Sequence, residues 1–159
     1  MYKHILIPTD GSELSKLALQ EGIALARALG ARVTAVTVTV PFHTISADPG
    51  MVTDTPERHT ERMTAIAAQY LNEAKDIASA AGVECDLVRV EHDHPYRAII
   101  DTAGQRGCDA IHMASHGRRG VSAILLGSET FKVLTHSSIP VIVCRQPRLS
   151  TLVQNAFAS

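Results

Sequence analysis

The sequence has no excess of charge of either sign and no long apolar run. The chain has fifteen lysine and arginine residues and sixteen aspartate and glutamate residues, so its formal net charge is −1. Proteins that bind nucleic acids or membrane surfaces broadly usually carry a basic excess, so the charge balance argues against both kinds of partner. No apolar stretch approaches the roughly 20 residues needed to cross a bilayer, and we expect no membrane-spanning segment.

Cysteine is also scarce. Cys85, Cys108 and Cys144 are odd in number, widely spaced and set beside apolar residues. This pattern is typical of buried free thiols in a reducing compartment and not of a disulfide framework. Near the N-terminus, Lys3-His4 leads straight into an apolar strand pattern, and no signal-peptide pattern is visible. We therefore expect a cytoplasmic protein.

The 159 residues, 45% hydrophobic and 19% charged, match one ordinary globular domain with a substantial core. Short apolar runs alternate with segments of helical periodicity, which predicts the α/β class and a single doubly wound, five-stranded parallel sheet with right-handed crossovers. We place the domain at residues 1–145 and expect a polar C-terminal tail at residues 146–159. The strands are expected at residues 5–7, 33–40, 83–91, 109–114 and 140–144.

The expected helices are marked by their end signals. Ser12 is a good N-cap for the first helix and Gly30 is placed to end it, while Thr55 and Gly82 bracket a long amphipathic helix. Shorter helices are expected from Pro95 and over residues 128–135, and an irregular loop over residues 41–54. The apolar positions expected along the first helix are Leu14, Leu17, Ala18, Leu25, Ala28 and Leu29.

A glycine-bracketed loop between the fourth strand and the last helix predicts an anion site. Gly117 opens the loop, residues 118–126 follow, and Gly127 stands at the start of a helix. Backbone N–H groups freed by glycine and the positive end of a helix dipole together suit phosphate oxygens. The adjacent arginines, among them Arg118, either clamp phosphates or are simply solvated. The loop itself is also consistent with a plain strand-to-helix turn.

The first strand supplies the other half of this predicted site. With the first strand central and the fourth beside it, ligands bind beyond the carboxyl ends of the two strands, where the strand order reverses. The loop over residues 8–12 would therefore meet the glycine loop. Asp10 could hold ribose hydroxyls or a phosphate-bound Mg²⁺, or merely cap the following helix.

Two runs of the sequence resemble hallmarks of the universal stress protein family. Its nucleotide-binding members carry G-x2-G-x9-G-[S/T] after the fourth strand, and this chain matches with Gly117, nine further residues, and then Gly127 and Ser128. The run IPTDGS at residues 7–12 resembles the ending of the family's first strand. The similarity covers most of the chain, and the two motifs together are quite specific.

The resemblance implies a flavodoxin- or Rossmann-like sheet with strand order 3-2-1-4-5 and a homodimer joined through the last strand. It also implies binding of ATP or AMP, with Mg in the case of ATP, without an obvious fast reaction. Carried over by position, the residues around the adenosine are Pro8, Thr9, Asp10 and Val38. Those along the triphosphate are Met113, Ala114, Gly117, Gly127, Ser128 and Glu129, the last through its backbone.

One position departs from the family pattern, because the first glycine of the motif is Ala114 here. If that residue had to adopt a positive φ, alanine would cost about 1 kcal/mol. A methyl group directed at a phosphate would block the site, whereas an extended backbone would be compatible with binding. The departure motivates an alternative function, a nucleotide-free homodimer that acts through protein contacts.

The leading hypothesis remains an ATP- or AMP-binding signalling or stress-response module. Nothing in the sequence resembles a general base poised to activate water, so any hydrolysis should be slow. An adenylyl transferase on the same sheet is a third hypothesis. The chain lacks both the Ser-Gly-Gly-x-Asp-Ser and the His-x-Gly-His signatures of such enzymes, which argues against it.

Overall fold

A computed structural model describes residues 1–42, 55–117 and 126–145 of the chain. Three expectations from the sequence concern residues outside these ranges. Most of the irregular loop expected over residues 41–54, the Arg118 phosphate contact and the tail at residues 146–159 all lie outside the described residues.

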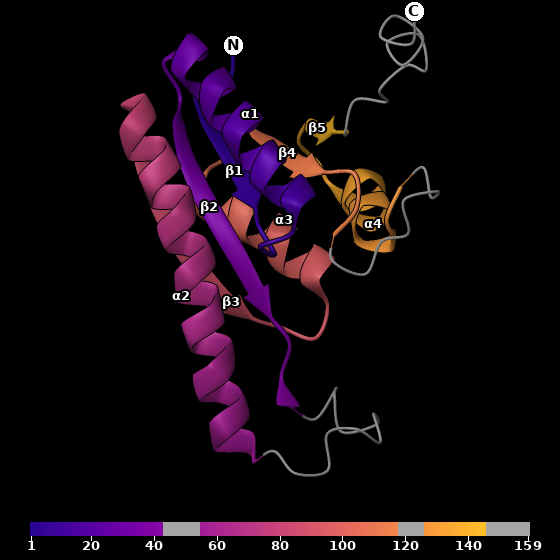
Figure 1. Cartoon of the computed structure of the whole chain (residues 1–159). Helices are drawn as coiled ribbons and strands as arrows, with labels where there is room; N and C mark the ends of the chain where they lie inside the picture. Colours follow the sequence, from indigo (N-terminus) through magenta and orange to yellow (C-terminus); the bar gives the residue numbers. More distant parts are fainter. Residues whose placement is uncertain (43–54, 118–125, 146–159) are drawn as a thin grey trace, which may run out of the picture.

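The described chain forms a five-stranded sheet with helices on both faces (Figure 1). The strand order is β3-β2-β1-β4-β5, and every neighbouring pair is parallel. The predicted fold class and strand order are therefore confirmed. The elements in chain order are β1 (His4–Pro8), α1 (Glu13–Leu29), β2 (Arg32–Thr39), α2 (Pro56–Ala81), β3 (Cys85–Glu91), α3 (Pro95–Arg106), β4 (Ala110–Ala114), α4 (Ser128–His136) and β5 (Val141–Cys144).

Local chemistry sets the ends of the two longest helices, as the sequence predicts. The Ser12 hydroxyl accepts a hydrogen bond from the Ser15 N–H at 3.2 Å, and Gly30 ends α1 with φ of 64°. The Thr55 hydroxyl accepts from the Arg58 N–H at the start of α2, and Gly82 closes that helix with φ of 68°. Each cap satisfies backbone groups that the first or last turn leaves free.

The core lies in two layers, one on each face of the sheet. Figure 1 shows α1 and α2 side by side over one face, where their apolar side chains pack on Ile5 and Ile7 of β1. Helices α3 and α4 cover the other face around Leu6 and Ile111. Because β1 and β4 are covered on both sides, both are rich in apolar residues, and the histidine in the middle of β4, His112, is buried as well.

The expected apolar face of α1 was partly wrong. Ala28 is exposed, and Leu25 and Leu29 only border the core. The sequence contains apolar residues almost all round this helix, so periodicity alone did not identify the buried side. The buried residues of α1 are Leu14, Ser15, Ala18, Leu19, Gly22, Ile23 and Ala26.

None of the helices in the described part of the chain has both the length and the apolar character that a membrane crossing requires.

Candidate functional site

The strand order changes direction between β1 and β4, which is where ligands bind in open α/β sheets, and we call the carboxyl edge between these two strands the crevice. β1 pairs with β2 as far as Pro8, but its pairing with β4 covers only Ile5 with Ala110 and Leu6 with Ile111. The next residue, Thr9, donates to the Val36 carbonyl of β2 at 2.9 Å. Successive residues of a parallel strand bond to opposite neighbours, so Pro8 is the residue that would donate toward β4. Proline has no N–H group, and the β1–β4 ladder stops there.

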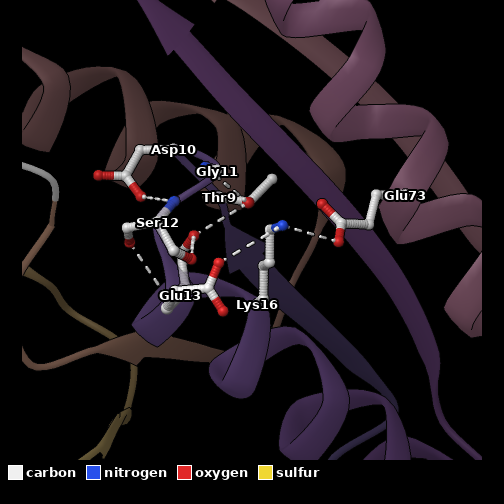
Figure 2. Close-up of polar contacts among 8 residues, drawn as sticks. Thr9, Asp10, Gly11, Ser12, Glu13, Lys16 and Glu73 are labelled. Carbon is white, nitrogen blue, oxygen red and sulfur yellow. Dashed lines mark hydrogen bonds and ion pairs between the residues drawn. The ribbon is translucent and has the colours of Figure 1, made fainter.

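The loop after β1 is held in one conformation by its own side chains (Figure 2). Asp10 Oδ1 accepts from the Ser12 N–H at 3.0 Å. The buried Thr9 hydroxyl lies 3.3 Å from the Ser15 hydroxyl and accepts weakly from the Gly11 N–H. Ser12 acts as the N-cap of α1, as predicted. The loop thus turns the Asp10 side chain out of the strand and toward the edge of the sheet.

Gly11 is required at its position for two reasons. Its φ of 74° is in the left-handed region. In addition, the ring of Tyr70, from the middle of α2, fills the space that a Cβ atom would need. Helix α2 therefore supports the loop that carries Asp10, a contact that no local sequence signal indicates.

The glycine loop meets the first loop at the same edge of the sheet. Asp10 Oδ2 lies so close to the backbone of Gly117 that a side chain at Gly117 would collide with it. At the far end of the glycine loop, the Gly127 N–H donates to the Ser115 carbonyl at 2.7 Å. A Cβ atom on Gly127 would stand 3.0 Å from the His116 Cα atom. The structure thus brings Asp10 to Gly117 and brings Gly127 to Ser115 and His116 at the end of β4, so the two loops meet as the sequence predicts.

Ala114 fits this arrangement without backbone strain. It is the last residue of β4, and no residue other than glycine has a positive φ in the described ranges. Its methyl group is buried in a small cluster with Leu14 and Ala18 of α1 and with Cys144. Alanine in place of the first glycine of the family's motif therefore causes no left-handed backbone strain in this chain.

Helix α4 presents its N-terminus to the crevice. Its N-cap is Gly127, which has no side chain to occupy the first-turn amides. Ser128 is exposed at the first helical position. The Glu129 carboxylate accepts from the Tyr96 N–H at the start of α3 and from Lys132 Nζ of its own helix, both at 2.9 Å. Glu129 thus has only its backbone available to a ligand at the crevice.

Two predicted contact residues are partly or wholly buried in the core below the crevice. The Met113 side chain is buried against the α3–α4 layer, so only its backbone can reach a ligand. Val38, near the end of β2, is half-buried and packs with Val90 and Tyr96 on that layer.

Lys16 lies beside the first loop but is already engaged by carboxylates. Its Nζ atom is 3.4 Å from Glu73 of α2 and 3.7 Å from Glu13 (Figure 2). The hydrogen bond to Glu73, together with the charges of both glutamates, raises the pKa of Lys16. Lys16 thus joins α1 to α2 on the side of the loop where Tyr70 also packs.

The cysteines are free thiols, as predicted, although Cys85 is only half-buried. Burial raises the pKa of Cys108 to about 11 and that of Cys144 to about 12. Both thiols are therefore protonated near neutral pH, and neither is a nucleophile there. Within the described ranges, no three histidine, cysteine or acidic side chains come together in a metal-binding cluster.

A hollow of about 420 Å³ lies between α1 and α2, lined by none of the predicted contact residues. It has one charged residue, Arg27, and its other lining residues offer no hydroxyl or carboxylate. The remaining lining residues are Gln20, Ile23, Ala24, Ala28, Ile77 and Ala81.

Comparison with known sequences extends this description. A sequence model of the universal stress protein family matches residues 1–145. The chain is 31% identical over 150 residues to a universal stress protein of Methanocaldococcus jannaschii, covering 93% of this chain and 85% of that protein. It is 30% identical over 160 residues to a putative universal stress protein of Staphylococcus aureus, with 99% and 93% coverage.

Solved structures share the fold. A hypothetical protein solved as a test case of structural genomics superposes with a TM-score of 0.79 and 28% identity, over 93% of this chain and 99% of that one. A universal stress protein from Archaeoglobus fulgidus, solved in complex with dAMP, superposes with a TM-score of 0.65 and 23% identity over 91% and 98% of the two chains. From the matched sequence and the shared architecture together, the chain belongs to the universal stress protein family.

Proposed function

We propose that this chain binds an adenine nucleotide, ATP or AMP, in the crevice between β1 and β4, and that it works as a signalling or stress-response module. The observation that carries the proposal is the contact of the Asp10 carboxylate with the Gly117 backbone at the carboxyl edge of the sheet. It sets an acidic side chain beside a glycine-rich loop stem and a helix N-terminus, the combination that ribose and phosphate need.

Relatives of the same fold support the choice of an adenine nucleotide. One universal stress protein was solved in complex with cAMP and another with dAMP. In this chain the adenosine would lie over Pro8, Thr9, Asp10 and Val38. The phosphates would lie along the backbone of Met113, Ala114, Gly117, Gly127, Ser128 and Glu129, with Arg118 as a further contact.

Asp10 is the residue we assign to Mg²⁺ when the ligand is ATP. A carboxylate and a triphosphate repel each other, and a divalent cation between them removes this repulsion. Carboxylate oxygen is a ligand that Mg²⁺ prefers. With AMP, the same carboxylate would accept from the ribose hydroxyls. The other nearby carboxylates, Glu13 and Glu129, are paired with lysines, so hydrolysis is slow at most.

We further propose a homodimer joined through β5 and α4. β5 is an edge strand of the sheet, and its residues Val141, Ile142 and Val143 are only half-buried. On α4, Phe131 is 61% exposed and Leu134 is 40% exposed. An unpaired strand edge beside exposed apolar side chains is typical of a surface covered by a second copy. The free thiols fit a cytoplasmic location for this dimer.

Mass spectrometry of small molecules released on denaturation, followed by calorimetric titration of the stripped protein, tests the nucleotide. We expect adenine nucleotides to be released and ATP or AMP to rebind, with GTP much weaker. If no adenine nucleotide binds at millimolar concentration while the protein stays dimeric, the nucleotide proposal is wrong. The chain would then act through protein contacts alone.

A further inference from the structure

Two buried threonine hydroxyls hold the carbonyl groups at which the strands of the crevice end. The Thr37 hydroxyl, from β2, donates to the Thr9 carbonyl at 3.1 Å. The Thr130 hydroxyl, from the first turn of α4, donates to the Ala114 carbonyl at 3.0 Å. All four residues are at least nine-tenths buried. Each hydroxyl thus comes from a neighbouring element and not from the loop that it holds.

The Ala114 carbonyl needs this partner because the sheet offers it none. The Ser115 N–H that follows it donates to the Cys144 carbonyl of β5 at 2.8 Å. In a trans peptide the C=O and the following N–H point in opposite directions, so the Ala114 carbonyl faces away from β5, toward β1. The β1–β4 ladder has already ended at Leu6 and Ile111. A buried carbonyl without a partner is costly, and the Thr130 hydroxyl supplies the missing donor.

The same geometry fixes the peptide planes from which both loops start. Holding the Thr9 carbonyl sets the direction of the Asp10 N–H and hence the path of the chain into Asp10. Holding the Ala114 carbonyl to α4 ties the beginning of the glycine loop to the helix that follows it. The Gly127 N–H bond to the Ser115 carbonyl, at 2.7 Å, closes the same stem from the other side. Each half of the crevice is thereby fixed to a neighbouring element before a ligand binds.

We propose that Thr37 and Thr130 are positioning residues for the nucleotide, acting through the Thr9 and Ala114 carbonyls without touching the ligand. The inference rests on the proposed function of the crevice. It assigns part of the binding affinity to two hydroxyl groups outside the predicted contact residues. Preorganised loops lose less conformational freedom on binding, so the hydroxyls raise affinity by holding the empty site in its bound form.

The test replaces each hydroxyl by a methyl group of the same shape. Thr37→Val and Thr130→Val remove the donor and keep the volume, whereas Thr37→Ser and Thr130→Ser keep the donor. Thr102→Val is the matched control, because Thr102 is equally buried but its hydroxyl donates at 2.6 Å to the Ala98 carbonyl within α3. Calorimetric titration with AMP and with Mg·ATP gives the affinity, and thermal unfolding gives the stability of each variant.

We expect the Kd for AMP to rise at least about tenfold in each valine variant at positions 37 and 130. The serine variants should bind within about threefold of the wild type. Thr102→Val should keep its affinity and lose less stability, because the Ala98 carbonyl still accepts from the backbone of α3. Equal affinity in all variants would overturn the inference while leaving the proposed function intact. A wild-type protein that binds no nucleotide would instead overturn the proposed function.

If a valine variant does not fold, amide hydrogen exchange and AMP affinity in its serine counterpart still test the positioning role. In the serine variant the Asp10 and Ser115 amides should exchange as slowly as in the wild type. Fast exchange at these two amides with unchanged AMP affinity would contradict a positioning role.

Discussion

The Asp10 carboxylate lies directly against the backbone of Gly117, although the two residues follow different strands. The contact exists because β1 and β4 are neighbours in the sheet and diverge where Pro8 ends their ladder. It places an acidic side chain at the mouth of the glycine loop. The Asp10 carboxylate would repel a phosphate at this position. We therefore expect a cation between the two groups, a ribose hydroxyl in place of the phosphate, or a displacement of the carboxylate.

Gly117→Ala tests this contact. The added methyl group collides with Asp10 Oδ2, which lies at the far end of a side chain, so we expect the carboxylate to move and the fold to survive. We expect AMP affinity to fall about tenfold, or about 1.4 kcal/mol, with a change in Tm of no more than about 2 °C. Calorimetry and thermal unfolding measure the two effects. Unchanged affinity would show that the Asp10–Gly117 contact does not form part of the binding site.

Two glycines inside helices are expected to respond in opposite directions to alanine. A Cβ atom on Gly104 of α3 meets nothing within 4 Å, so Gly104→Ala should stabilise the protein by about 0.5–1 kcal/mol through helix propensity. A Cβ atom on Gly22 of α1 would lie 2.7 Å from Ile7 Cδ1 and 3.0 Å from His112 Nδ1. Both neighbours are buried, and Gly22→Ala should destabilise by about 1–3 kcal/mol. Urea denaturation measures both, and a stabilised Gly22→Ala variant would contradict the described packing.

The features that sequence alone predicted are those whose cause lies within a few residues. Ser12 with Gly30 and Thr55 with Gly82 mark helix ends by local hydrogen bonding and by left-handed glycines. The continuous apolar run of β1 predicted a strand covered on both faces. From such signals the α/β class and the helix ends could be inferred, whereas the strand order 3-2-1-4-5 was implied by the resemblance to the universal stress protein family.

The features that sequence missed depend on the meeting of distant segments. The Tyr70 ring over Gly11 and the Thr130 hydroxyl on the Ala114 carbonyl each join two separate elements. For Thr130 a weak signal did exist, since it stands three residues before the buried Val133 and shares its helix face. A polar residue on a buried face needs a partner, and that requirement could have marked Thr130 as a candidate.

The stability of the fold should decline when the pH falls from about 7 to about 5. Burial lowers the pKa of His4 and of His112 below the usual 6.5, and each has a buried Nδ1 atom without a hydrogen-bond partner within the described part of the chain. The unfolded chain therefore binds more protons than the folded chain as the pH falls below 6.5. Stability is fully present above that pH and is lost as the pH drops toward the folded-state values.

Urea midpoints measured between pH 7.5 and pH 5 check this dependence. His112→Leu should flatten the profile, because it removes one of the two histidines that must stay neutral in the core. Its effect should be greatest at the acid end. A wild-type midpoint that does not change across this range would contradict the burial of neutral histidines.

Phe131→Glu should convert the proposed homodimer into a monomer. Phe131 is 61% exposed on α4, and a charge at the centre of an apolar interface is strongly unfavourable. Leu87→Glu is the matched control, because Leu87 is 37% exposed but lies on β3 at the opposite edge of the sheet. Analytical ultracentrifugation should show a monomer for the first variant and a dimer for the second. If both variants stay dimeric, the interface is elsewhere.

The most direct test of the central claim is a titration of the stripped, isotope-labelled protein with AMP, followed by NMR of the backbone amides. The account predicts that the largest chemical-shift changes fall on Asp10, Gly117, Ser128 and Thr130, at the carboxyl edge between β1 and β4. Shifts confined to the hollow between α1 and α2 around Ile23 and Ile77, or no shifts at millimolar AMP, would contradict it.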